Sequence, residues 1–186
     1  MMNQTMWIVL GVVVFVLVYV WSLYNSLVRE STEIDEAFGQ IDVQLKRRAD
    51  LIPNLVTTVK GYAKHEKTVF AEVTKARSAL VKAETPAKMA QANDMLTGAL
   101  KSLFAVAEAY PQLQANQSFV QLQKELSDTE DKVAYARQYY NTQLLEYNLK
   151  TKVFPNTLLA GAMGFKEREF FKASDAEREV TKVAFE

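Results

Sequence analysis

Apolar side chains fill the start of the chain without interruption. From Met6 to Leu27 there is no charged residue, and an α-helix of this length would measure roughly 33 Å, which matches the hydrocarbon thickness of a bilayer. Trp7 stands near one end and Trp21 and Tyr24 near the other, as in the aromatic belts of membrane interfaces. The pattern predicts a single-pass transmembrane helix within an N-terminal anchor, residues 1–28.

Two other interpretations of this span are disfavoured. A cleaved signal peptide needs a basic N-terminal region and a small-residue cleavage site, and neither is found. A core helix of a soluble protein would need later segments that are apolar on all sides to surround it, and none follows. Basic residues come only after the span, at Arg29 and from Lys46 to Arg48, which favours an external N-terminus and a cytoplasmic body.

Beyond the span, apolar residues recur with a mean spacing of 3.5 from Ile34 to Leu80. This spacing predicts a long amphipathic helix, or a pair of helices, whose apolar stripe packs on other helices. Pro53 interrupts the pattern, and proline inside a helix removes one backbone hydrogen bond. Because the stripe keeps its phase across Pro53, a kinked continuous helix is favoured over two helices joined by a loop.

Two further long helices follow. Thr85 before Pro86 predicts a capped helix start, and this helix extends to Tyr110. After a polar link, apolar residues continue at a 3.5 spacing from about Asn116 to Lys152, which predicts the third long helix.

Breaks and short elements are predicted near the C-terminus. Phe154-Pro155-Asn156 ends the third helix, Gly161 and Gly164 mark a turn, and a capping box at Ser174 to Glu177 predicts a short helix. The predicted fold class is therefore all-α: one N-terminal transmembrane helix, then an elongated antiparallel bundle of three long helices with short C-terminal pieces. No linker divides residues 29–186, so they are expected to form one domain.

Composition supports this fold and excludes several functions. The chain has 6 Gly and 4 Pro among 186 residues, too few for a turn-rich β architecture. It has no Cys, which excludes disulfides, thiolate nucleophiles and cysteine-based metal sites. With 22 basic and 22 acidic residues the formal net charge is zero, so no nucleic-acid partner is expected.

No motif for catalysis stands out. His65 is the only histidine, and Val69 occupies the position where a zinc-protease helix would need a second one. There is no glycine-rich phosphate loop and no nucleophile elbow. We therefore expect neither an enzyme nor a bound metal or cofactor.

Charged residues on the apolar stripe are the most informative polar positions. Arg48 and Glu66 fall on it, about 27 Å apart along one helix, so each needs a partner from another helix. Candidate partners lie near the stripe of the third helix: Glu130, Arg137, Asn141 and Asn148. Such groups usually fix the register of helices, and a structural network is favoured over a ligand site.

The stretch Gln44-Leu45-Lys46-Arg47-Arg48-Ala49-Asp50-Leu51-Ile52-Pro53-Asn54-Leu55-Val56 resembles the signature of the LemA family of bacterial membrane proteins. Further matching pieces follow in order: Tyr24-Asn25, Lys75-Ala76-Arg77, Ala109-Tyr110-Pro111, Phe119 with Leu122, Tyr140-Asn141, Tyr147-Asn148, Phe154-Pro155 and Gly164-Phe165. One departure is the stretch Thr181-Lys182-Val183-Ala184-Phe185 near the end, where family members often have a proline before the last Val-x-Phe. The resemblance implies a bacterial cell membrane location, one anchor, a helical bundle and no known enzymatic activity; a relative takes part in building magnetosome membranes.

The lengths of the predicted helices suggest how copies could associate. The first helix exceeds the other two, which leaves apolar positions near the membrane uncovered: Ile34, Phe38 and Ile41. The alternative is that Phe165, Phe170 and Phe171 of the C-terminal segment cover them.

Three functional hypotheses follow. The leading one is a membrane-anchored scaffold that self-assembles as a homo-oligomer, or organises other membrane proteins, and so shapes a membrane. The second is an adaptor that docks one specific enzyme or membrane partner. The third is a cryptic enzyme or ligand sensor that uses the polar network.

Overall fold

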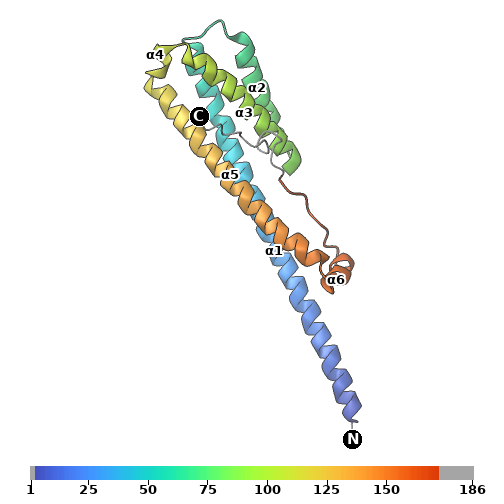
Figure 1. The fold of residues 1–186 in the computed structure, drawn as a ribbon. Helices are drawn as coiled ribbons and strands as arrows, with labels where there is room; N and C mark the ends of the chain where they lie inside the picture. Colours follow the sequence, from blue (N-terminus) through green and yellow to red (C-terminus); the bar gives the residue numbers. More distant parts are fainter. Residues whose placement is uncertain (1–2, 172–186) are drawn as a thin grey trace, which may run out of the picture. The chain divides into compact units, whose positions relative to one another are not determined.

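The computed structural model describes residues 3–171, and these residues form six α-helices and no strand (Figure 1). The helices are α1 (Gln4–Lys60), α2 (Lys67–Val81), α3 (Pro86–Glu108), α4 (Pro111–Gln114), α5 (Gln117–Lys152) and α6 (Asn156–Ala162). The predicted all-α class is confirmed. The capping box at Ser174 and the departure at Thr181 lie outside the described residues.

The helix α1 continues through Pro53, as predicted. Proline has no N–H to donate to the carbonyl four residues earlier, which is that of Ala49. Arg77 of α2 supplies the missing donor: its Nε donates to the Ala49 carbonyl oxygen at 2.8 Å. The helix therefore passes the proline without leaving this carbonyl unpaired.

Between Ile34 and Leu80 the structure confirms the alternative of a helix pair, and the expectation of one continuous helix is wrong. The helix α1 ends at Lys60, a turn follows, and α2 begins at Lys67. Val73, on α2, is fully buried like the stripe residues of α1. A spacing of 3.5 describes two successive helices of one bundle as well as it describes one long helix. The turn between α1 and α2 therefore cannot be located from the spacing of apolar residues.

The other predicted boundaries agree closely with the structure. The Thr85 side chain accepts a hydrogen bond from the Lys88 backbone N–H at 3.3 Å, with Pro86 as the first residue of α3. The polar link before α5 contains the single turn α4. At the start of α5, Asn116 Oδ1 accepts from the Phe119 N–H at 3.1 Å, which caps the helix.

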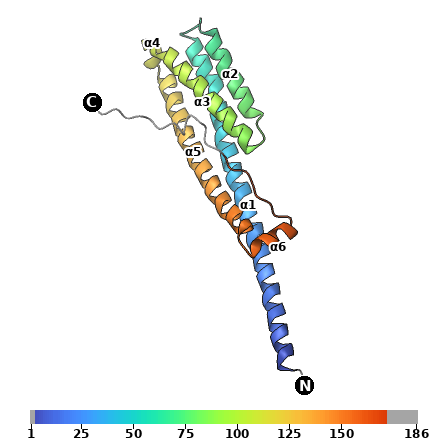
Figure 2. The same cartoon turned by 45° about the vertical axis from the view of Figure 1, so that its right-hand side comes forward.

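The chain divides into two compact units. The first unit contains described residues 3–37 and 140–168, and the second contains residues 38–139 with residues 169–171. In the first unit, the end of α5 and α6 lie beside α1 (Figure 2). In the second, α2 and α3 pack side by side against the later part of α1 and the earlier part of α5 (Figures 1 and 2).

Candidate functional site

Arg48 is the most deeply buried charge of the second unit, with 2% of its surface exposed. Its Nη1 donates to Asn93 Oδ1 of α3 at 2.6 Å, and its Nη2 lies 3.4 Å from Glu130 Oε2 of α5. Burial lowers the pKa of Arg48, and the Glu130 carboxylate opposes this shift. One guanidinium thus links three helices of the bundle.

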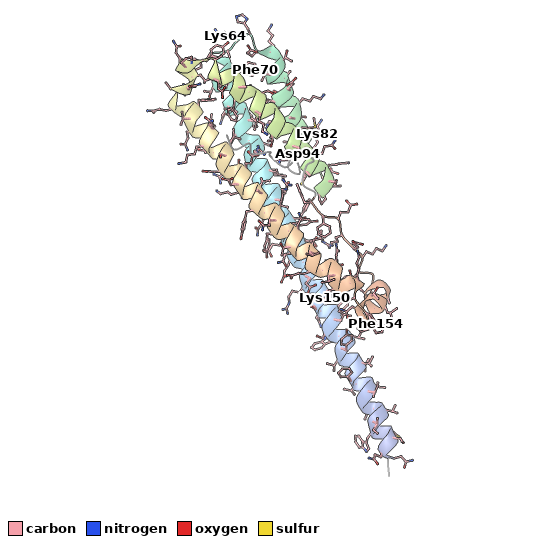
Figure 3. The ribbon with its side chains drawn as sticks, viewed as in Figure 1. Lys64, Phe70, Lys82, Asp94, Lys150 and Phe154 are labelled. Carbon is pink, nitrogen blue, oxygen red and sulfur yellow. The ribbon has the colours of Figure 1, made fainter. Side chains whose placement is uncertain are left out.

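A cleft of about 520 Å³ opens beside Arg48 between α3 and α5. Acidic and basic side chains are mixed along its walls, which include Arg48, Lys101, Arg137, Asp94 and Glu130. Figure 3 labels Asp94. Arg48 and Glu130 neutralise each other across the cleft, so its lining does not select a strongly charged ligand. This arrangement supports a structural network more than a ligand site.

The expected partners of Arg48 and Glu66 separate into different places. Glu130 pairs with Arg48 although its side chain is 53% exposed, and Arg137 places its Cζ 5.0 Å from the centre of the Phe171 ring in the same unit. Asn141 and Asn148 belong to the first unit. The prediction that Glu66 is buried and paired is wrong, because Glu66 lies at the turn before α2 and is half-buried.

Asn148 organises a second polar cluster, inside the first unit. Its Nδ2 donates to the Arg168 carbonyl oxygen and its Oδ1 accepts from the Arg168 N–H, both at 3.0 Å. The Arg168 guanidinium donates to Asp35 and, at 2.8 Å, to Ser31 of α1. The bond to Asp35 raises the pKa of Arg168. The segment after α6 is thereby fastened to both α1 and α5.

A further ion pair in this unit joins Lys150 of α5 to Glu30 of α1, and Lys150 also donates to Ser26 Oγ at 2.9 Å. Glu30 is the first acidic residue of the chain. Tyr147, one turn before Lys150, is buried, and burial raises the pKa of its phenol. The contacts of Lys150 join α5 to α1.

The residues expected to form an exposed self-association seam are largely covered. Ile34 is 1% exposed and Ile41 is fully buried, while Phe38 is half-buried, so this prediction is wrong for both isoleucines. The physical reason is that segments other than the long helices also pack against α1. In the first unit, Arg168 binds Ser31 and Asp35 on either side of Ile34.

The predicted membrane-interface residues are all exposed. Trp7, Trp21 and Tyr24 expose 61%, 69% and 47% of their surfaces. The most apolar 18-residue window of α1 has a mean hydropathy of 2.5, and only 6% of it is buried. By length and composition, α1 can cross a membrane once.

Two functional side chains were missed by sequence reasoning. Asn93 had a signal, because it continues the stripe of Met89, Leu96 and Leu100 on α3, where a polar residue needs a partner. Arg168 had none, because it follows α6 outside any helix and shows no periodicity.

A basic concavity of about 820 Å³ lies where α1 ends and α2 begins. Four lysines line it: Lys60, Lys64, Lys67 and Lys75. They surround Phe70, whose ring centre is 5.3 Å from Lys60 Nζ, and Figure 3 labels Lys64 and Phe70 at this end of the bundle. A surface of this chemistry suits an acidic segment with an apolar side chain. Among residues 3–171, no group of three His, Asp or Glu side chains could hold a metal ion.

Comparison with known proteins finds relatives named LemA and MamQ. The chain is 29% identical to Protein LemA of Metamycoplasma hominis, over 91% of this chain and 78% of that protein. It is 26% identical to Magnetosome protein MamQ 2 of Paramagnetospirillum magneticum, over 90% and 71%, and 25% identical to Magnetosome protein MamQ of Magnetospirillum gryphiswaldense, over 82% and 66%. The model of the LemA family matches residues 37–185. With Arg48, Pro53 and Arg77 all inside the matched region, the chain belongs to the LemA family.

Proposed function

We propose that this protein is a membrane-anchored helical scaffold that organises copies of itself, and other proteins, at a bacterial cell membrane. The observation that carries the proposal is the apolar window of α1, only 6% of which is buried, because a bilayer would cover the side chains that this window exposes. In each unit a buried polar side chain holds two segments together, since Arg48 binds Asn93 of another helix and Asn148 binds the backbone at Arg168, and this supports a structural role. The resemblance to proteins named as magnetosome proteins supports an organising function.

Self-association has to use surfaces other than Ile34 and Ile41, since these are buried. The span itself is the best supported route, because the bilayer confines neighbouring spans and raises their effective concentration. The proposal places the N-terminus outside and the helical bundle in the cytoplasm, in accordance with the basic residues that follow the span.

Energy transfer between labelled copies in vesicles tests self-association. The chain has no native cysteine, so Ser118→Cys accepts a single donor or acceptor dye on the exposed start of α5. A scaffold is expected to show transfer that persists when lipid is added in excess at a constant amount of protein. Transfer that falls to the value for randomly distributed monomers contradicts the scaffold and leaves the adaptor hypothesis.

The basic concavity supports an adaptor as the second candidate function. Its four lysines and Phe70 offer charge and apolar contact to an acidic partner segment. A photo-crosslinking amino acid at the exposed Ala71 inside the concavity tests this in cells. The adaptor predicts one dominant crosslinked partner that disappears when Lys64 and Lys67 are changed to Glu. Crosslinks that survive this reversal of charge count against it.

A further inference from the structure

An uncharged segment connects α5 to the chain beyond α6. Residues 153–165 contain no Asp, Glu, Lys or Arg, and Lys152 and Lys166 flank them directly. Several large apolar side chains of this segment are exposed: Val153 by 45%, Phe154 by 80% and Leu158 by 68%. In water this arrangement leaves apolar surface without a partner.

Two contacts within the first unit fix the position of this segment along α1. The Tyr19 hydroxyl donates to Asn156 Oδ1 at 2.5 Å, at the start of α6. The rings of Tyr24 and Phe165 pack edge to face with their centres 5.8 Å apart. Tyr19 and Tyr24 lie on either side of Trp21 in the sequence, so both contacts fall at the aromatic end of the span.

This depth is where aromatic belts meet the lipid headgroups. Asn156 contacts α1 two residues from Trp21, which is about 3 Å along the helix axis. The Lys150–Glu30 ion pair lies nine residues beyond Trp21 on α1, about 14 Å farther along it, where charges can be hydrated. Figure 3 shows Lys150 and Phe154 at the end of α5, with Phe154 nearer to α6.

We propose that residues 153–165 form an interfacial foot that rests in the same leaflet as Trp21 and Tyr24. Phe154 and Leu158 enter the boundary between headgroups and acyl chains, and Lys152 and Lys166 lie among the lipid phosphates. The segment thus combines apolar side chains with basic flanks, the chemistry of segments that lie in the membrane surface. The inference rests on the membrane anchoring in the proposed function.

The bilayer is the occupant that the contacts favour over a second copy of the chain. Tyr19 binds α6 directly, so the foot lies against the part of α1 that the proposed function places in the bilayer. The same bond gives the Asn156 amide oxygen a partner, which a polar group at this depth requires.

Fluorescence quenching on the full-length chain in vesicles of phosphatidylethanolamine and phosphatidylglycerol tests the foot. Since there is no native cysteine, Phe154→Cys and Leu158→Cys can each carry one polarity-sensitive dye. The matched control is Tyr135→Cys, an aromatic position of α5 that is 74% exposed. Val14→Cys, in the apolar window, reports on the span itself.

The foot predicts blue-shifted emission at positions 154 and 158, loss of fluorescence with lipids that carry a nitroxide near the headgroup, and protection from aqueous iodide. Position 135 should show the reverse. If 154 and 158 behave like 135 while the emission at 14 is blue-shifted and protected from iodide, the foot is refuted and the anchor stands. If iodide quenches position 14 as well, the anchoring fails first. Shielding at 154 and 158 that vanishes on dilution with lipid assigns the surface to a second copy and also overturns the foot.

Discussion

Arg77 Nε donates to the carbonyl oxygen of Ala49, the group that Pro53 leaves without its helical donor. A side chain on α2 thereby replaces one backbone hydrogen bond of α1. Arg77 and Pro53 both belong to the stretches that resemble the LemA pattern. The contact gives a physical reason for an arginine at position 77 when position 53 is proline. It also couples the two positions energetically.

This coupling predicts a non-additive pair of substitutions. Arg77→Ala should reduce the free energy of unfolding by about 1.5 to 3 kcal/mol, because it removes a hydrogen bond from a charged donor. In a Pro53→Ala background the loss should be smaller, since the introduced alanine has a backbone N–H of its own that can donate to the Ala49 carbonyl. Denaturant unfolding of the four proteins in mild detergent measures the cycle. Equal losses in both backgrounds would show that Arg77 acts independently of the proline.

Arg48 and its neighbour Arg47 should differ sharply in their effect on stability. Arg48→Ala removes the bonds to Asn93 and Glu130 and takes the guanidinium donor from the amide oxygen of the buried Asn93, so a loss of about 1.5 to 3 kcal/mol is expected. Arg47 is exposed, and Arg47→Ala should cost less than about 1 kcal/mol. Unfolding midpoints under identical conditions give the comparison. Similar, small losses at both positions would contradict the buried network.

Asn148 is expected to hold the segment around Arg168 in place. Asn148→Ala removes both hydrogen bonds to the Arg168 backbone and should accelerate amide exchange there by at least about tenfold, which corresponds to about 1.4 kcal/mol. Hydrogen exchange followed by mass spectrometry reports this locally. Glu146→Ala, at an exposed position of the same helix, is the control and should leave exchange at Arg168 unchanged. Unchanged exchange in the Asn148 variant would refute the role of the amide.

Tyr147 predicts a dependence of stability on alkaline pH. Burial raises the pKa of Tyr147 above the unfolded value of about 10. The contribution of the neutral phenol to the free energy of unfolding is therefore complete below about pH 10 and is lost as the pH rises beyond it, because the unfolded chain ionises first. Tyr147→Phe removes this ionisation. The variant should gain stability relative to the parent above about pH 10, by at most about 1.4 kcal/mol per pH unit. Unfolding measured from pH 8 to 11 tests this, with the exposed Tyr135→Phe as control; parallel curves would contradict it.

The orientation of the chain can be read with single cysteines. Ser118→Cys, on the exposed start of α5, should resist an impermeant thiol reagent in spheroplasts and react after lysis. Asn3→Cys, before the span, should react in both conditions. The opposite pattern would reverse the proposed topology.

Sequence reasoning predicted the helices well where periodicity and caps act locally. The boundaries at Thr85 and near Asn116 depend on side chains that bind backbone groups a few residues away, and such signals are visible in a single sequence. The turn after Lys60 was missed because two helices of one bundle share the same 3.5 spacing. The burial of Arg48 was predicted, but its partner Asn93 was not, since the choice of partner depends on how helices pack.

The burial of Ile34 could not be predicted from periodicity for a different reason. Its neighbours Ser31 and Asp35 bind Arg168, which follows the last helix and belongs to no periodic pattern. The comparison of helix lengths pointed the other way, whereas the alternative, cover by the C-terminal segment, agrees with the position of Arg168. The six residues between α1 and α2 explain the error at Glu66. A continuous helix would have placed Glu66 on the buried stripe, but Glu66 lies in the turn between the two helices.

The bond between Tyr19 and Asn156 joins residues 137 positions apart, and the Arg168–Asp35 pair joins residues 133 apart. Between them in the sequence lie residues 38–139, which make most of the second unit from contacts among neighbouring helices. During synthesis the apolar start of α1 leaves the ribosome first, yet its partners in α6 and at Arg168 emerge only after residues 38–139 have been translated. Local helical contacts form faster than distant ones. The nascent chain is therefore expected to bind the bilayer through α1 first and to fold residues 38–139 next. The first unit is completed last, when α6 and Arg168 pack against α1.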